Sequence, residues 1–215
     1  MASLLLFLFL SSAALAALPG GRCQEQKVFL QRAGASFSGR EYRSLLTVSN
    51  GEAFGAWTWP EMCPDDFYAV GFSLRVEPNQ YAADDTALNG IRLICAKQED
   101  RSFLYSVESH TGYFGDWSQP QYCPSGVLTA FQLRVEPHQG PLVDDTAANN
   151  IKFRCSSNPT LEGHGAAWGE YGPWSEECSG GGICGIETKM EYHQPDLDDS
   201  TLNDVRFHCC DRPQQ

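Results

Sequence analysis

The sequence carries one pattern three times, and this repetition constrains the fold more than any other feature does. "DDTALNGIRLIC" at 84–95 returns as "DDTAANNIKFRC" at 144–155 and as "DDSTLNDVRFHC" at 198–209. A similar aromatic turn precedes each copy: "FGAWTWPEMC", "FGDWSQPQYC" or "YGPWSEEC". The cysteines that end the turn and the motif are 32 residues apart in two copies (95 − 63 and 155 − 123) and 31 in the third (209 − 178). Such agreement predicts three structurally equivalent units.

Each unit has the alternation that is typical of β-strands. Over residues 68–76, apolar side chains alternate with small or polar ones, which gives a period of two and one apolar face. Residues 91–95 repeat this pattern one strand later. "YRSLLTVSNG" and "FLYSVESHTG" add an opening strand that ends in turn-forming residues. No segment has convincing helical periodicity, so we predict an all-β fold of three antiparallel sheets, about four strands each, packed around a shared axis.

The first residues are typical of a secretory signal peptide. "MASLLLFLFLSSAALAALPGG" combines an apolar run with small residues and an Ala-x-Ala site that ends at Ala16. This run is too short to span a bilayer, which takes about 20 apolar residues, and no later segment is apolar enough. We expect a signal peptide over 1–23, cleaved after Ala16 or as late as Cys23, and a secreted, extracellular protein. A flexible lead-in over 24–40 and a domain over 41–211 follow, with repeats at about 41–99, 100–158 and 159–210.

Nine cysteines in a secreted chain imply disulfide bonds. The first and last cysteines of each repeat occupy equivalent places, which predicts the pairs Cys63–Cys95, Cys123–Cys155 and Cys178–Cys209. Cys184 and Cys210 have no counterparts in the other repeats and are expected to pair with each other. The crossed alternative, Cys178–Cys210 with Cys184–Cys209, stays open, and Cys23 is either removed with the signal peptide or left over.

The charge and the absence of familiar motifs exclude several functions. A net charge of −12 disfavours nucleic acid and anionic membranes as partners, because both select Lys/Arg patches. The five histidines are scattered without metal-ligand spacing, and no phosphate loop or nucleophile elbow is present. We therefore expect no metal and no cofactor, and a monomeric protein.

Several stretches match a known family. They are "REYRSLLTVSNG", the three "DD" motifs, "WGEYGPWS", "CGIETKMEY" and the terminal "HCC", and they cover roughly residues 40–210. In these stretches the chain resembles the vitelline membrane outer layer protein I family. The resemblance implies a β-prism, in which three antiparallel four-stranded Greek-key sheets are related by a pseudo-threefold axis. It also implies a structural or binding role in an extracellular glycoprotein layer or fluid, in association with mucin-like glycoproteins or their glycans.

We interpret the repeated acidic motif as a structural turn. Glycosidases need two carboxylates about 5–9 Å apart, whereas adjacent strand residues point to opposite faces, and calcium needs more oxygen ligands than the motif offers. Asp and Asn stabilise turns, and basic residues beside each motif could form ion pairs with it. An active site is not expected three times in one chain, so a structural role is assigned to Asp84, Asp85, Asn89, Asp144, Asp145, Asn149, Asp198, Asp199 and Asn203.

Function is expected where the repeats differ. Trp57, Trp117 and Trp174 are interpreted as equivalent packing residues, whereas Trp59 and Trp168 break the repeat. Because sugar rings stack on exposed aromatic faces, possible glycan contacts are Trp59, Trp168, Asp65, Asp66, Glu170 and Glu176. We expect a binding protein and not an enzyme. Two alternatives remain: a lectin without turnover, or a transferase or hydrolase on N-acetylglucosamine oligomers, whose carboxylates would come from Asp65, Asp66, Glu99, Asp100, Glu170, Glu176 and Asp204.

Overall fold

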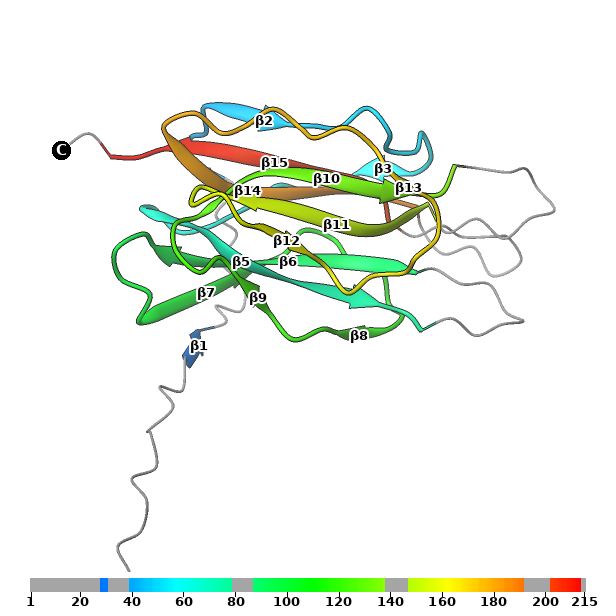
Figure 1. Ribbon diagram of the computed structural model, residues 1–215, viewed down its shortest axis with the longest axis horizontal. Coiled ribbons are helices and arrows are strands. Elements are labelled where there is room, and N and C mark those ends of the chain that lie inside the picture. The colour runs from blue at the N-terminus through cyan, green and yellow to red at the C-terminus, as the bar shows by residue number, and fades with distance from the viewer. Residues whose placement is uncertain (1–27, 31–38, 79–86, 138–146, 192–201, 214–215) are drawn as a thin grey trace, which may run out of the picture.

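Three long β-hairpins form the frame of the protein. The computed structural model describes residues 28–30, 39–78, 87–137, 147–191 and 202–213, and every regular element in these ranges is a β-strand. The predicted all-β class is therefore confirmed. The long strands run along the long axis of the molecule (Figure 1). They pair as β5 (Phe67–Val76) with β6 (Leu88–Lys97), β10 (Leu128–Val135) with β11 (Ala148–Cys155), and β14 (Gly181–Met190) with β15 (Leu202–Asp211).

Short strands extend each hairpin into a sheet. The first sheet has the order β1-β7-β6-β5-β8, with β9 also paired to β5; its added strands are β1 (Val28–Leu30), β7 (Phe103–Val107), β8 (Asp116–Trp117) and β9 (Gln121–Tyr122). The second has the order β12-β11-β10-β13, with β12 (Thr160–Glu162) and β13 (Glu170–Tyr171) added. The third has the order β2-β15-β14-β3, with β4 also paired to β14; the added strands are β2 (Ser44–Leu46), β3 (Ala56–Trp57) and β4 (Glu61–Met62).

The sheets do not coincide with the sequence repeats. Each hairpin is completed by the opening strand and the aromatic turn of the next repeat, and the third hairpin is completed by β2, β3 and β4 of the first repeat. The opening strand and the turn lie on opposite edges of the hairpin, so the chain between them must cross it, as in a Greek key. The predicted β-prism of three Greek-key sheets is confirmed. Because β2 of the first repeat pairs with β15 of the third, the two ends of the domain are joined in one sheet.

The lead-in contains one strand that the sequence did not predict. β1 falls inside the segment expected to be a flexible lead-in, and it pairs with β7 in parallel, whereas all the other pairs described are antiparallel. The pairing covers the outer edge of β7, which would otherwise present unpaired backbone groups.

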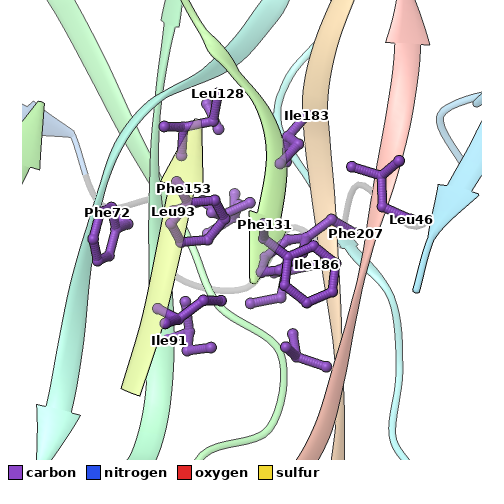
Figure 2. Close-up of a cluster of buried hydrophobic side chains, with 14 of the residues drawn as sticks. Leu46, Phe72, Ile91, Leu93, Leu128, Phe131, Phe153, Ile183, Ile186 and Phe207 are labelled. Atoms are coloured by element: carbon purple, nitrogen blue, oxygen red, sulfur yellow. The ribbon is translucent and has the colours of Figure 1, made fainter. Parts of the chain in front are cut away.

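The three sheets meet on one shared core (Figure 2). Phe72 of β5, Phe131 of β10, Phe153 of β11 and Phe207 of β15 are at most 1% exposed. The ring centroids of Phe72 and Phe153 are 4.7 Å apart, those of Phe131 and Phe207 4.8 Å, and those of Phe153 and Phe207 5.2 Å. Burying such a side chain contributes about 1.5–3 kcal/mol, and tilted ring pairs add to it. Because the rings come from all three sheets, no sheet buries its apolar face alone.

Four disulfide bonds hold one end of the prism together. Three of them join the segment that precedes a long hairpin to the strand that closes it: Cys63–Cys95, Cys123–Cys155 and Cys178–Cys209. The fourth joins Cys184 to Cys210, so the structure contains the uncrossed pairing. Cys23 lies outside the described residues.

Candidate functional site

The end of the prism opposite the disulfides is built from three equivalent turns. These aromatic turns are residues 54–57, 114–117 and 168–171, and the glycine in each has a positive φ, namely 73° at Gly55, 77° at Gly115 and 68° at Gly169. A Cβ atom at any of them would collide with the carbonyl of the last residue of a long strand, which is Met190, Val76 or Val135 respectively. Glycine is therefore required for the turn to lie against the strand end.

The pairing register of the short strands corrects the sequence-based interpretation of Trp174. Trp57 lies opposite Lys189, Trp117 opposite Arg75, and Tyr171 opposite Arg134, so Tyr171 is the third counterpart of Trp57 and Trp117. The prediction that Trp174 fills this place was wrong, because "WGEY" and "YGPW" both fit the spacing aromatic-Gly-x-aromatic and only strand pairing distinguishes them. It follows that Trp168 does not break the repeat, since it occupies the position of Phe54 and Phe114.

The equivalent inner rings are each stacked against a cation. The guanidinium of Arg92 lies 3.9 Å from the Trp117 ring and that of Arg206 lies 4.2 Å from the Trp57 ring. The Lys152 ammonium lies 3.9 Å from the Tyr171 ring. Each cation also pairs with a carboxylate, of Glu108, Glu187 or Glu162 in the same order. These rings are thus fixed by cation–π contacts and hold the turns in place.

The surroundings of Tyr171, in the third aromatic turn, change the pKa of its hydroxyl group. Its hydroxyl donates to the Glu162 carboxylate at 2.9 Å. Partial burial, with the Glu162 carboxylate as a second cause, raises the pKa of Tyr171 well above its usual range. The phenol therefore stays protonated at neutral pH and keeps this hydrogen bond.

The outer rings of the aromatic turns face solvent. Phe54, Phe114 and Trp168 are 43%, 39% and 48% exposed, and we call these three side chains the aromatic crown. Asp116 and Glu170, both exposed, lie two residues beyond Phe114 and Trp168. Of the predicted glycan contacts, the structure therefore brings Trp168 and Glu170 together at this end.

Trp59 is exposed near the same end but does not belong to the crown. It is half exposed, and its ring packs edge-on against His110 with centroids 5.4 Å apart. The Ser109 hydroxyl donates to the Trp59 carbonyl at 2.6 Å, which fixes the backbone of the β3–β4 loop. Trp59 thus lies on the loop between β3 and β4, outside the aromatic turn at residues 54–57.

A charged groove lies at the disulfide end. It has a volume of about 640 Å³ and is lined by residues 39–43, Asp65, Asp66, Tyr68 and residues 210–213. Asp65 and Asp66, two predicted glycan contacts, are both on its wall, whereas Glu176 is exposed elsewhere. The structure thus places Trp168 and Glu170 at one end of the prism and Asp65 and Asp66 at the other, which the sequence did not indicate.

The groove carboxylates are poorly placed for general acid catalysis. The Asp65 side chain is 92% exposed and lies 3.9 Å from the Arg40 guanidinium. Asp211 accepts two hydrogen bonds from Arg43, at 3.0 and 3.2 Å, and is 48% exposed. A general acid at neutral pH needs a carboxyl group shielded from water and from cations, because only then does it keep its proton.

A carboxyl group with a raised pKa lies elsewhere, at Asp204. Burial raises the pKa of Asp204 to about 6, although the Val205 N–H bond and the charges of Lys189 and Arg206 act against the shift. Asp204 lies beneath the crossover at Gly51, where a Cβ atom would collide with the carboxyl group. Its cross-strand partner is Lys189, on β14 near the aromatic end, so it does not share the groove with Asp65 and Asp66.

The repeated acidic motif is only partly described. The six Asp residues 84, 85, 144, 145, 198 and 199 lie outside the described residues. The three Asn residues Asn89, Asn149 and Asn203 are fully buried at the start of β6, β11 and β15. The Asn149 amide donates to the carbonyl of Ala147, which has a φ of 48°, at 3.2 Å. That contact holds the strained entry into the strand.

Within the described ranges, no group of three or more His, Cys, Asp or Glu side chains is placed to hold a metal ion. The same ranges contain no helix of the length and apolarity needed to cross a bilayer.

Comparison with known proteins identifies the family. Residues 44–212 match the family described as Vitelline membrane outer layer protein I. The chain belongs to this family. It is similar to the vitelline membrane outer layer protein 1 homologs of Mus musculus and Homo sapiens, each 49% identical over 171 residues that cover 79% of this chain and 84% of the relative.

Solved structures with a similar shape include plant lectins. Frutapin, a lectin from Artocarpus incisa, has 12% sequence identity and a TM-score of 0.49, over 80% of this chain and 99% of the lectin. An artocarpin–mannotriose complex has 13% identity and a TM-score of 0.49, over 79% of this chain and 98% of artocarpin.

Proposed function

We propose that this chain is a secreted component of an extracellular glycoprotein layer or fluid, and that it binds the glycans of mucin-type glycoproteins through the aromatic crown. The observation that carries the proposal is the exposure of Phe54, Phe114 and Trp168 at one end of a rigid, disulfide-bonded prism. Large apolar rings that stay 39–48% exposed in the folded domain are accessible to a ligand.

The chemistry of the crown suits saccharides. The C–H face of a sugar ring stacks on an aromatic ring, and its hydroxyl groups donate hydrogen bonds to nearby carboxylates. The crown offers both kinds of group, because Trp168 lies two residues from Glu170 and Phe114 two residues from Asp116. The carboxylates and the net charge of −12 disfavour anionic lipids and nucleic acids, which otherwise compete for exposed aromatic surfaces.

The construction of the domain suits a long-lived extracellular component. Its four disulfides are typical of proteins that fold in an oxidising compartment. The strand β2, near the start of the domain, pairs with β15 at its end. Local unfolding of either terminus must therefore break the hydrogen bonds between these two strands. Such a domain is expected to resist proteolysis while it is bound to a mucin.

A binding assay with matched variants tests the proposal. Immobilised mucin and a set of N-acetylglucosamine oligomers are titrated with the wild type, with Trp168→Ala and with Phe103→Ala. Phe103 is 58% exposed and starts β7 near the disulfide end, so it controls for the loss of any exposed ring. We expect Trp168→Ala to weaken binding about tenfold and Phe103→Ala to leave it unchanged. Equal effects, or no binding by the wild type, would contradict the proposal.

Catalysis in the charged groove is the second candidate function. It would use Asp65, Asp66 and Tyr68, which line one groove, but the exposure of Asp65 and its contact with Arg40 make it the less supported candidate. Incubation with N-acetylglucosamine oligomers should then yield new chain lengths that are lost in Asp65→Asn and Asp66→Asn. Unchanged oligomers with the wild type would dismiss this candidate and leave binding without turnover.

A further inference from the structure

We propose that His208 is a pH sensor of the third sheet, and that its protonation loosens the aromatic turn at residues 54–57. A continuous line of contacts joins the two, from His208 through Glu187 and Arg206 to Trp57. This switch needs no ligand. Its consequence for glycan binding rests on the proposed function, because the turn carries Phe54 of the aromatic crown.

His208 is a buried polar residue without a partner. It lies on β15 and is 3% exposed. Its neighbours Phe207 and Cys209 belong to the shared core, so the imidazole lies on the opposite face of the sheet. Neither of its ring nitrogens has a hydrogen-bond partner among the described residues. Polar atoms buried in this way destabilise a fold, so packing gives no reason for a histidine at this place.

The other sheets show that the fold does not need a histidine here. Ile94 lies opposite Gly71 in the first sheet, as His208 lies opposite Gly185 in the third. Ile94 is 1% exposed and has no polar side-chain atom to leave unpaired. The second sheet has Arg154 at the same place, and its side chain is partly exposed. A residue that costs stability where its counterpart does not is expected at a functional site.

The imidazole is faced by groups from three elements of the described chain. From β14, Oε2 of Glu187 lies 3.7 Å from Nε2 of His208. From the segment before β2, the half-exposed Tyr42 ring stands at 82° to the imidazole, with centroids 4.5 Å apart. From β15 itself, the charge of Arg206 acts on the ring. Burial lowers the pKa of His208 from its usual value of 6.5, although the Glu187 carboxylate opposes the shift, so the imidazole is neutral at pH 7.

Protonation of His208 changes the bonds of Glu187. The carboxylate holds Arg206 with both oxygens, since Oε1 accepts from Nη2 at 2.7 Å and Oε2 accepts from Nε at 2.9 Å. A protonated imidazole carries a donor on each nitrogen and attracts the same Oε2. A charge-assisted hydrogen bond needs about 2.7–2.9 Å, so closing the gap takes a shift of about 1 Å. That shift draws Oε2 away from the Nε of Arg206.

Arg206 passes this change to the aromatic turn. Its guanidinium lies 4.2 Å from the Trp57 ring, and the Glu187 carboxylate sets its orientation. Once Oε2 leaves, a single carboxylate oxygen holds the guanidinium, and the cation–π contact that fixes the indole weakens. Trp57 and Phe54 belong to the same four-residue turn, so the position of the exposed Phe54 ring becomes less fixed. Acid is therefore expected to weaken the third part of the crown.

NMR of the Trp57 indole between pH 7.5 and pH 4.5 tests the switch. Asp204 also interacts with Arg206, and burial raises its pKa to about 6, so all the proteins compared carry Asp204→Asn. We expect the Trp57 signals to shift with the same midpoint as the His208 ring protons. Adding His208→Ile, the residue that the first sheet has at this place, should abolish that shift. His208→Gln keeps a polar side chain without the charge and should match the isoleucine variant.

Three results would overturn the switch: Trp57 signals that shift equally in the His208 variants, Trp57 signals that stay constant while His208 titrates, and a His208 ring that stays neutral down to pH 4.5. Binding to immobilised mucin at pH 7.5 and pH 5 measures the consequence. The wild type should lose about threefold in affinity at pH 5 relative to His208→Ile, because binding must then order one more side chain. Equal pH dependence in both proteins would refute this consequence. No binding at either pH would refute the proposed function and leave the switch standing, since the NMR test uses no ligand.

Discussion

Replacement of Asp204 by asparagine is expected to stabilise the protein at neutral pH. Asp204, Asn150 and Gly90 are equivalent, since they lie opposite Lys189, Arg134 and Arg75. The second sheet thus already uses an amide at this place, where the Asn150 side chain donates to the Gly163 carbonyl at 2.9 Å and accepts from the Ile151 N–H at 2.8 Å. Asp204 also accepts a bond from its neighbour, the Val205 N–H, at 2.8 Å, but an ionised carboxylate has no proton to donate.

The magnitude follows from the pKa of Asp204, which burial raises from 3.8 to about 6. A raised pKa means that the folded state prefers the protonated form. The favourable contribution is therefore fully present below pH 3.8 and is lost as the pH rises through about 6. Two pH units correspond to at most about 3 kcal/mol, and screening of this partly exposed group reduces the effect to about 1–2 kcal/mol at pH 7.

Thermal unfolding of Asp204→Asn and wild type between pH 4 and pH 7.5 measures this effect. A gain of about 1–2 kcal/mol in a domain of this size corresponds to a rise of about 3–6 °C in Tm. We expect that rise at pH 7.5 and a much smaller difference near pH 4, where Asp204 is protonated. The reciprocal variant Asn150→Asp is the matched control and should lose about 1–2 kcal/mol at pH 7.5.

Two results would refute this reasoning. The first is a difference in Tm that stays constant from pH 4 to pH 7.5, since ionisation of Asp204 would then have no part in it. The second is a lower Tm for Asp204→Asn at pH 7.5, which would mean that the carboxylate gains more from Lys189 and Arg206 than burial costs it.

Further variants test the turns, the disulfides and the repeated motif. Gly169→Ala should destabilise the protein by about 1–3 kcal/mol in urea unfolding, because φ is +68° and the Val135 carbonyl blocks a Cβ atom, whereas Gly39→Ala, with open space around it, should be neutral. Cys184→Ser/Cys210→Ser opens a 26-residue loop and should cost about 3–4 kcal/mol, read from the shift in denaturation midpoint. Asp145→Ala should lower the Tm in calorimetry, and an unchanged Tm would contradict the structural interpretation of the acidic motif.

The equivalence of the three units could be predicted from the sequence, but the residue correspondence at the third turn could not. Three long alternating segments and three matching cysteine spacings are local features, so they are visible in one dimension. "YGPW" and "WGEY" overlap at Tyr171, and both have an aromatic residue on each side of a glycine. Only the pairing of Tyr171 with Arg134 decides between them, because register depends on hydrogen bonds between strands far apart in sequence.

The candidate site could be predicted only in part for a similar reason. The sequence alignment of the repeats marks Trp168 and Glu170 as residues that differ between them, yet the structure assigns Trp168 to the repeated position of Phe54 and Phe114. Exposed aromatic residues next to a turn glycine were the available signal for the crown, and "FG", "FG" and "WG" carry it. Exposure itself depends on the neighbouring sheets, which the sequence does not place.

By itself, the sequence determined the class of the fold, its threefold repetition and the equivalence of the cysteines, because these depend on periodicity and spacing along the chain. The tertiary structure alone decided that each sheet takes its edge strands from the next repeat, and that β2 and β15 join the two ends of the domain. It alone placed the predicted contacts Trp168 and Glu170 at one end of the prism and Asp65 and Asp66 in the groove at the other. The physical reason is that strand pairing and burial are non-local, since their free energies depend on which segments lie next to each other in space. The same local sequence pattern is compatible with several such arrangements.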